Sequence, residues 1–336
     1  MQIEQNISLR QYNTFGIDVK AKLFSSFGTQ EELDDLLTPT SKLPTIILGG
    51  GSNILFTKDF DGLVLKNETK GIDLIKEDLN HVYVRSGAGE NWHQFVLYAI
   101  QRNWAGLENL SLIPGNVGAS PMQNIGAYGV EIREIFDELE AYHKKERKIH
   151  TFSANDCEFG YRDSVFKKKY RNDFVIMNVT FRLNKKPHFN ISYGAIEEEL
   201  EKMGVKDLNI QAVSQAVINI RSSKLPDPAK IGNAGSFFKN PEIGMKQYNK
   251  LQALFPDIIG YPLQNGNTKL AAGWLIEACG WKGIRRGDAG VHTQQALVLV
   301  NYGEATGKEL YDLSEKILQS VKRKFGIQLE REVNII

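Results

Sequence analysis

The sequence has few cysteines, no long apolar run and almost no net charge, and each of these features excludes a class of protein. Cys157 and Cys279 are the only cysteines in 336 residues, which excludes a disulfide framework and a cysteine metal site. No stretch approaches the ~18 consecutive apolar residues of a transmembrane helix. The first residues lack the basic and apolar regions of a signal peptide. We therefore expect a cytoplasmic protein that does not insert into a membrane.

Charge is balanced, because 41 basic and 40 acidic side chains give a formal net charge of +1. No overall field favours nucleic acid or an anionic membrane, so we expect neither as a partner. We also expect no metal site, because six histidines show no ligand spacing along the chain: His81, His93, His143, His150, His188 and His292. The length of the chain favours two or three domains over one.

Helix and strand patterns alternate along the chain and predict a mixture of both. Thr29 with Glu32 predicts a capping box at the start of a short helix, and Asn91 caps a second helix with an apolar face. Apolar runs at 45–48 and 82–84 predict strands that end in the glycine turns 49–51 and 87–89. Residues 310–325 predict a long amphipathic helix, and 175–181, 296–300 and 333–336 predict further strands.

Two glycine-rich segments indicate a ligand with phosphate groups. LGGGSN at 48–53 lets backbone amides approach an anion, although a simple tight turn explains it equally well. A long loop at 111–129 is rich in glycine and amide side chains, and an ordered loop of this length usually binds something. The predicted cofactor contacts are Gly49, Gly50, Gly51, Ser52, Asn53, Gly115, Gly118, Ala119, Ser120, Gln123, Asn124, Gly126 and Ala127.

Three further motifs carry side chains that could do chemistry, but on their own they favour structural roles. Arg162 in YRDSVFK could stabilise an anion, although an ion pair with Asp163 is the more common explanation. Ser236 in GNAGSFFKNP lacks a nucleophile elbow, so its remaining catalytic use is as a neutral proton donor. Glu332 in LEREV leads into an apolar strand, where an exposed strand entry is the usual explanation.

Taken in order, these motifs resemble the UDP-N-acetylenolpyruvoylglucosamine reductase family over nearly the whole chain. The resemblance rests on nine segments: NTFG, LGGGSN, IPGNVGASPMQNIGAYG, YRDSVFK, KLPDP, GNAGSFFKNP, KLAAGWLIEACGWKG, HTQQALVLVN and LEREV. It implies an α+β fold of three domains. Residues 1–69, with a return strand at 333–336, and residues 70–220 would bind FAD as in the vanillyl-alcohol-oxidase (PCMH-like) flavoproteins. Residues 221–332 would bind the UDP-sugar.

The resemblance also implies an activity and a cofactor. FAD, bound without a covalent link, would take a hydride from NADPH and pass it from N5 to C3 of the enolpyruvyl ether of UDP-N-acetylglucosamine-enolpyruvate. A proton at C2 would complete UDP-N-acetylmuramate, a precursor of peptidoglycan, and the enzyme is expected to act as a monomer. Two alternatives stay open: an oxidase of the same flavin superfamily, and a nucleotide-sugar-binding protein without catalysis.

Residue by residue, the resemblance matches Ser236 to the proton donor, and Arg162 and Glu332 to the other catalytic residues. It suggests substrate contacts at Tyr193, Lys224, Asn240 and Gln295, with Tyr193 in the substrate-capping loop of the longer subtype. One departure is Asn334, which stands where a basic residue is often found and leaves one substrate contact in doubt.

Overall fold

A computed structural model describes residues 2–38, 40, 43–193 and 195–336. The chain divides into two compact units. Unit 1 comprises Met1–Ile7, Ala21–Gly51 and Asp61–Ser223, and unit 2 comprises Ser8–Lys20, Ser52–Phe60 and Lys224–Ile336. The predicted three-domain boundaries stay a prediction, since the units divide the chain at different positions.

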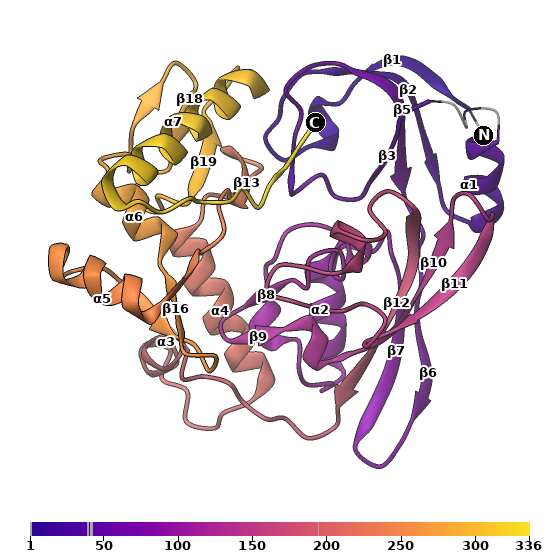
Figure 1. Cartoon of the computed structure of the whole chain (residues 1–336). Helices are drawn as coiled ribbons and strands as arrows, with labels where there is room; N and C mark the ends of the chain where they lie inside the picture. Colours follow the sequence, from indigo (N-terminus) through magenta and orange to yellow (C-terminus); the bar gives the residue numbers. More distant parts are fainter. Residues whose placement is uncertain (1, 39, 41–42, 194) are drawn as a thin grey trace. The chain divides into compact units, whose positions relative to one another are not determined.

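Unit 1 contains a five-stranded antiparallel sheet in the order β11-β10-β12-β7-β6 (Figure 1). Its strands are β6 (Ile72–Glu77), β7 (His81–Gly87), β10 (Phe136–His143), β11 (Lys148–Ser153) and β12 (Phe174–Asn184). Helix α2 (Trp92–Gln101) packs on this sheet, with the rings of Phe95 and Phe181 5.0 Å apart. As predicted, the Asn91 side chain caps α2 and accepts a bond from the Gln94 amide. The apolar face of α2 is buried, which fixes the loops at the ends of β7 and α2.

A second sheet of unit 1 has the order β1-β2-β5-β3, in which β3 and β5 pair in parallel. Its strands are β1 (Glu4–Ser8), β2 (Lys20–Phe27), β3 (Thr45–Leu48) and β5 (Phe60–Asn67). Helix α1 (Gln30–Leu37) is capped by Thr29, as predicted. The prediction of a full capping box is wrong, because the Glu32 carboxylate accepts a hydrogen bond from the amide of Gly28 at 2.6 Å instead of from the amide of Thr29. Unit 1 also contains β8 (Gly126–Ala127), β9 (Val130–Glu131), α3 (Ile196–Lys202) and α4 (Ile210–Lys224).

Unit 2 is built on a four-stranded sheet in the order β13-β19-β18-β17, on which helix α7 (Gly307–Phe325) packs. The strands are β13 (Gly232–Ser236), β17 (Arg285–Arg286), β18 (Ala289–Val291) and β19 (Val298–Asn301). A smaller sheet, β14-β16-β15, lies with α5 (Met245–Leu254) and α6 (Ala272–Ala278); its strands are β14 (Glu242–Gly244), β15 (Gly260–Pro262) and β16 (Asn267–Leu270). The strand predicted at 333–336 is shorter in the structure: β20 (Asn334–Ile335) pairs in parallel with β4 (Ile54–Leu55).

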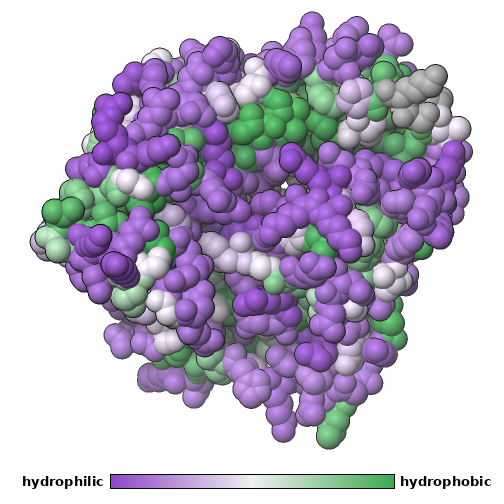
Figure 2. Space-filling model, viewed as in Figure 1, coloured by the Kyte–Doolittle hydropathy of each residue, from purple (hydrophilic) through white to green (hydrophobic). Residues whose placement is uncertain are grey.

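Polar side chains predominate on the face of the molecule shown in Figure 2. Within the residues that the structure describes, no helix is long and apolar enough to cross a membrane.

Candidate active site

The two glycine loops of unit 1 lie against each other. A Cβ atom on Gly50 would stand 2.9 Å from the Cα of Gly115, closer than side chains normally approach. The amide of Gly118 donates to the carbonyl of Ala88 at 2.9 Å, and a Cβ there would meet the Ala88 side chain at 2.5 Å. The loops at 49–51, 87–89 and 115–119 are therefore packed through backbone, and glycine is required because a side chain would separate them.

Arg162 reaches this glycine-rich region from the loop after β11. Its backbone is left-handed, with φ +53°. Its guanidinium donates to the carbonyl oxygen of Gly126 in β8 and, at 3.5 Å, to that of Asn124. Asp163 pairs with Lys168. These bonds place the positively charged guanidinium of Arg162 beside the last residues of the 111–129 loop.

Arg221 on α4 is a second cation near this loop, and no motif in the sequence singled it out. Its Nε donates to the carbonyl of Leu112 at 3.3 Å. Burial lowers the pKa of its guanidinium, Tyr128 acts in the opposite direction, and Arg162 adds to the lowering. No carboxylate among the described residues pairs with Arg221. Arg221 is only partly buried, and a partly enclosed guanidinium without a carboxylate partner is suited to an anionic ligand.

The backbone that holds Arg221 is itself unusual. Leu112 has φ +59°, a conformation that non-glycine residues seldom adopt. Its amide donates to Nδ1 of His93 at 3.0 Å, while its carbonyl accepts from Arg221. Burial, with a smaller contribution from Arg221, lowers the pKa of His93, so the ring stays neutral and can accept this bond. The strained residue is thus held from both sides.

Tyr193, a predicted substrate contact, is half exposed and lies against the same loop. A Cβ on Gly129 would come within 3.3 Å of the Tyr193 Cβ. The neighbouring Tyr128 is partly buried, and burial raises the pKa of its hydroxyl. Within unit 1, the predicted residues Arg162 and Tyr193 therefore gather at 126–129.

In unit 2, the segments that carry Ser236 and Glu332 run side by side. The amide of Glu332 donates to the carbonyl of Phe237 at 2.9 Å, and the amide of Lys239 donates to the carbonyl of Glu330 at 2.9 Å. Ser236 ends β13, is exposed, and its hydroxyl has no hydrogen-bond partner among the described residues. The Glu332 side chain is half buried. Two of the three predicted catalytic residues are thus on paired backbone segments.

Arg331 anchors this pairing to helix α7. Its Nε donates to the Ser314 hydroxyl at 2.8 Å, its Nη2 bonds the Glu315 carboxylate, and its guanidinium lies 4.6 Å from the centre of the Tyr311 ring. Side chains alternate along an extended segment, so Glu332 is expected to face away from α7. The opposite faces expected for Arg331 and Glu332 stay a prediction.

Asn53, the last residue of the LGGGSN motif, bonds to the segment of Glu332 within unit 2. Asn53 donates to the carbonyl of Glu332 at 3.3 Å. Asn334 returns two bonds to the carbonyl of Asn53, one from its amide at 3.1 Å and one from its side chain at 2.9 Å. Asn334, which the family resemblance left in doubt as a substrate contact, therefore helps to hold the Glu332 segment.

Asn240 and Gln295, both predicted substrate contacts, lie at the start of α6. The Asn240 side chain accepts the amide of Ala272 at 3.0 Å, and a Cβ on Gly273 would stand 3.1 Å from the Gln295 side-chain oxygen. Lys224 is exposed at the end of α4.

Comparisons with known proteins identify the family of this chain. The family model "UDP-N-acetylenolpyruvoylglucosamine reductase, C-terminal domain" matches residues 227–336, and the model "FAD binding domain" matches residues 22–150. The UDP-N-acetylenolpyruvoylglucosamine reductase of Amoebophilus asiaticus is 51% identical over 338 residues, which cover 100% of both chains. The one from Pseudomonas aeruginosa is 45% identical over 100% of this chain and 99% of its own.

This chain belongs to the UDP-N-acetylenolpyruvoylglucosamine reductase family. A crystal structure of the reductase (MurB) from Thermus caldophilus superimposes with a TM-score of 0.71 at 24% identity, covering 100% of this chain and 99% of that one, and so supports the fold. The predicted fold class, an α+β flavoprotein with an FAD-binding part and a family-specific C-terminal domain, is confirmed. The predicted use of FAD by a reductase of this family is confirmed as well.

The glycine loops of this family member fit a cofactor with phosphate groups. Among the described residues, no acceptor takes the backbone amides of Gly50, Gly115 or Asn116, and Gly115 is buried. Backbone amides that have no acceptor within the described residues are suited to binding an anion such as a pyrophosphate. These loops would hold FAD through backbone groups.

Two side chains predicted to contact the cofactor, those of Ser120 and Asn124, instead bond to other parts of the protein. The Ser120 hydroxyl donates to the carbonyl of Val117 at 2.7 Å. The buried Asn124 amide donates to Glu131 at 2.9 Å and to the carbonyl of Gly160 at 3.0 Å. The role of these residues at the cofactor stays a prediction, and the structure assigns their side chains to holding the loop in place.

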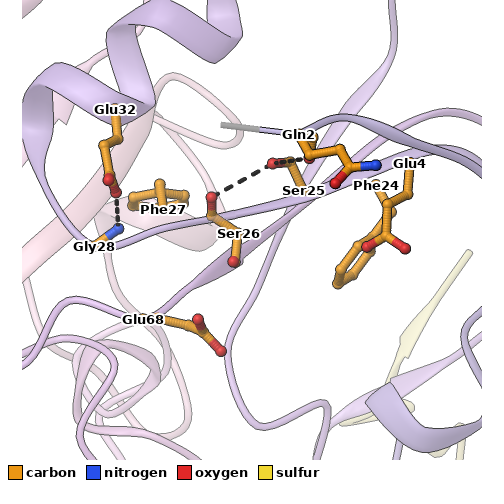
Figure 3. A pocket seen from close by; sticks show the side chains of 9 residues that line it. All are labelled: Gln2, Glu4, Phe24, Ser25, Ser26, Phe27, Gly28, Glu32 and Glu68. Carbon is orange, nitrogen blue, oxygen red and sulfur yellow. Dashed lines mark hydrogen bonds between the residues drawn. The ribbon is translucent and has the colours of Figure 1, made fainter.

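A pocket in unit 1 of about 500 Å³ does not suit this cofactor (Figure 3). Three carboxylates line it, from Glu4, Glu32 and Glu68, and no basic side chain does. The pKa of Glu68 is lowered chiefly by its hydrogen bond from Lys66, so this carboxylate is charged. An acidic wall repels phosphate, and the loops at 49–51 and 115–119 are the better candidates.

Proposed function

We propose that this chain reduces the enolpyruvyl ether of UDP-N-acetylglucosamine-enolpyruvate to UDP-N-acetylmuramate, with NADPH as the source of reducing equivalents. The observation that carries the proposal is the pairing of the Ser236 and Glu332 segments in a chain that matches its reductase relatives from end to end. The reaction belongs to peptidoglycan precursor synthesis, and we place it in the cytoplasm.

Bound FAD would supply a hydride to C3 of the substrate, and the protein must then supply a proton to C2. Ser236 is our proton donor. Its exposed hydroxyl has no acceptor among the described residues, so it is available to a ligand. An enolate at C2 is basic enough to take a proton from a serine without an activating base, provided that the hydroxyl lies within about 3 Å.

Arg162 and Glu332 act on the charge that develops during reduction. The excess charge spreads from C2 into the substrate carboxylate, where a guanidinium stabilises it. Arg162 is held for this role by the carbonyl of Gly126. Glu332 would donate as a neutral acid or fix the position of the acid group beside Ser236.

The remaining predicted residues would hold the substrate. Tyr193 would cover it from the edge of the glycine-rich loop, and Lys224, Asn240 and Gln295 would contact its polar groups. Arg221 extends this set, because its partly buried guanidinium has no carboxylate partner among the described residues and would pair with a phosphate or carboxylate of the bound ligands.

The experiment follows flavin colour in the absence of oxygen. Purified protein should be yellow, and NADPH should bleach it. Addition of UDP-N-acetylglucosamine-enolpyruvate should then restore the yellow colour stoichiometrically. A protein that bleaches but regains colour only with oxygen would be an oxidase of the flavin superfamily, and a colourless protein that does not take up FAD would be a binding protein.

The proposed organisation is a monomer of three domains, with boundaries at 69–70 and 220–221 and a return strand at 333–336. Pairing of β20 with β4 supports the return strand, since β4 lies within the first 69 residues. Light scattering on the eluting protein would measure the mass against the 37.9 kDa of one chain.

A further inference from the structure

We infer that the β10–β11 hairpin carries a binding site for a divalent transition-metal ion, with Zn²⁺ as the best-fitting class. The ligands are His143, Glu146 and His150. Their ligand atoms all lie within 4.8 Å of one another. None of the three belongs to the glycine loops or to the catalytic residues proposed above, so the site is independent of the reductase chemistry.

The antiparallel register brings these residues together, although their spacing in the sequence is not typical of a metal site. His143 is paired with Lys148, and Ala141 is paired with His150. The side chains at 143 and 150 therefore lie diagonally on one face of the hairpin. The turn between them places Glu146 beside both imidazoles, with Arg147 in a left-handed conformation at φ +58°.

The distances are close to those that a metal ion needs. The Glu146 carboxylate lies 2.9 Å from Nε2 of His150 and 3.7 Å from Nδ1 of His143. Ligand atoms at ~2.0–2.1 Å from a tetrahedral Zn²⁺ stand about 3.4 Å apart, which falls between these two values. Water would fill the fourth position, as in other zinc sites with three protein ligands.

Neighbouring groups limit the movement of the ligands. The ring of Phe174 contacts both imidazoles, with centroids 4.6 Å from His143 and 5.5 Å from His150. The turn is tied to α1 through Arg147, whose Nε donates to the Asp34 carboxylate at 2.7 Å. The ligand side chains remain accessible, since 17% of His143, 32% of His150 and 44% of Glu146 is exposed.

Two contacts compete with the metal ion. Lys148 lies 2.9 Å from the Glu146 carboxylate, and the Glu146 amide donates to Nδ1 of His143 at 3.1 Å. A metal ion would have to displace both contacts, which weakens its binding. The same competition gives the site a distinctive property: removal of the Lys148 charge should strengthen metal binding.

The test titrates tag-free, FAD-loaded protein with ZnCl₂ alone in a calorimeter. We expect one ion per chain with micromolar affinity, at least 10-fold weaker binding in His150→Ala and in Glu146→Gln, and several-fold tighter binding in Lys148→Met. Mg²⁺ should not bind, because it prefers oxygen ligands. Reductase activity without added zinc should be the same in all variants.

His188→Ala is the matched control, since it removes an exposed histidine outside the hairpin. Glu146→Gln alters only an exposed turn residue, so it tests the site even if a histidine variant does not fold. Equal zinc affinity in the wild type, His150→Ala and Glu146→Gln would overturn the inference. So would weaker binding in Lys148→Met, or an affinity no tighter than millimolar in the wild type.

Discussion

The backbone amide of Glu332 donates a 2.9 Å hydrogen bond to the carbonyl of Phe237, the residue that follows Ser236. Residues almost one hundred positions apart in the sequence are joined in this way at the end of β13. The position of Glu332 therefore depends on the contacts that hold residues 330–334 in place, and the side chains of Arg331 and Asn334 provide some of them.

Arg331→Gln should loosen this segment. It removes the bonds to Ser314 and Glu315 and the contact with Tyr311, so we expect a loss of about 1–2 kcal/mol in the free energy of unfolding. Urea denaturation measures this loss, and kcat should fall with it because Glu332 is less well positioned. Glu315→Gln, which leaves Arg331 in place, is the control and should cost less than ~1 kcal/mol. Equal kcat in Arg331→Gln and wild type would remove Arg331 as a positioning residue.

Arg221→Met should separate binding from stability. Methionine fills similar space without a partly buried charge, so the free energy of unfolding of the ligand-free protein should stay equal or rise. Loss of a charge-assisted hydrogen bond of about 1.5–3 kcal/mol should weaken the binding of FAD or of the UDP-sugar by at least ~10-fold. Titrations of each ligand would show which one Arg221 serves. A protein that is destabilised but binds both ligands normally would assign Arg221 a purely structural role.

Tyr142→Phe tests a contact that links α1 to the β10–β11 hairpin. The buried Tyr142 hydroxyl donates a hydrogen bond to the Asp34 carboxylate, which also accepts a hydrogen bond from Arg147. Burial, together with the bond to Asp34, raises the pKa of Tyr142 to about 12. A tyrosine in the unfolded chain titrates near about 10, so between these values the unfolded state loses its proton while the folded state keeps it. The contribution of Tyr142 to stability is therefore complete below pH 10 and decreases as pH rises towards 12.

Tyr142→Phe should accordingly cost about 1 kcal/mol at neutral pH, and the stability difference from wild type should shrink between about pH 10 and 12. Urea denaturation at a series of pH values measures it. A difference that stays constant over this range would contradict the assignment. The lowered pKa of Asp34, caused first by Arg147 and then by Tyr142, predicts a further loss of wild-type stability at acidic pH as this carboxylate takes up a proton.

Local signals in the sequence predicted the elements well. Asn91 caps α2 as expected because its side chain can satisfy a free helix amide, and the long amphipathic pattern near the end corresponds to α7. The strand predicted at 333–336 is reduced to the two residues of β20, and the side chain of its first residue, Asn334, bonds to Asn53. Such a contact depends on tertiary structure, which periodicity does not describe.

The roles of individual side chains at the site were harder to predict from the sequence. Arg221 belongs to no motif, and its importance depends on its partial burial without a carboxylate partner among the described residues. The spacing of His143 and His150 in the sequence is not typical of a metal site. The two side chains come together only because the hairpin pairs Ala141 with His150. Asn124 is an amide residue in a glycine-rich loop, as is typical of a ligand contact, yet its side chain bonds to Glu131 and holds the loop in place. In each case the deciding fact is a partner that is distant in the sequence.

The most direct test of the account measures the two half-reactions of Ser236→Ala separately under anaerobic stopped flow. Reduction of the flavin by NADPH should stay close to the wild-type rate, while its reoxidation by UDP-N-acetylglucosamine-enolpyruvate should slow by at least ~10²-fold. Ser153→Ala, an exposed serine on β11, should leave both rates unchanged. Equal slowing of both half-reactions in Ser236→Ala, or normal reoxidation, would contradict the assignment of Ser236 as the proton donor.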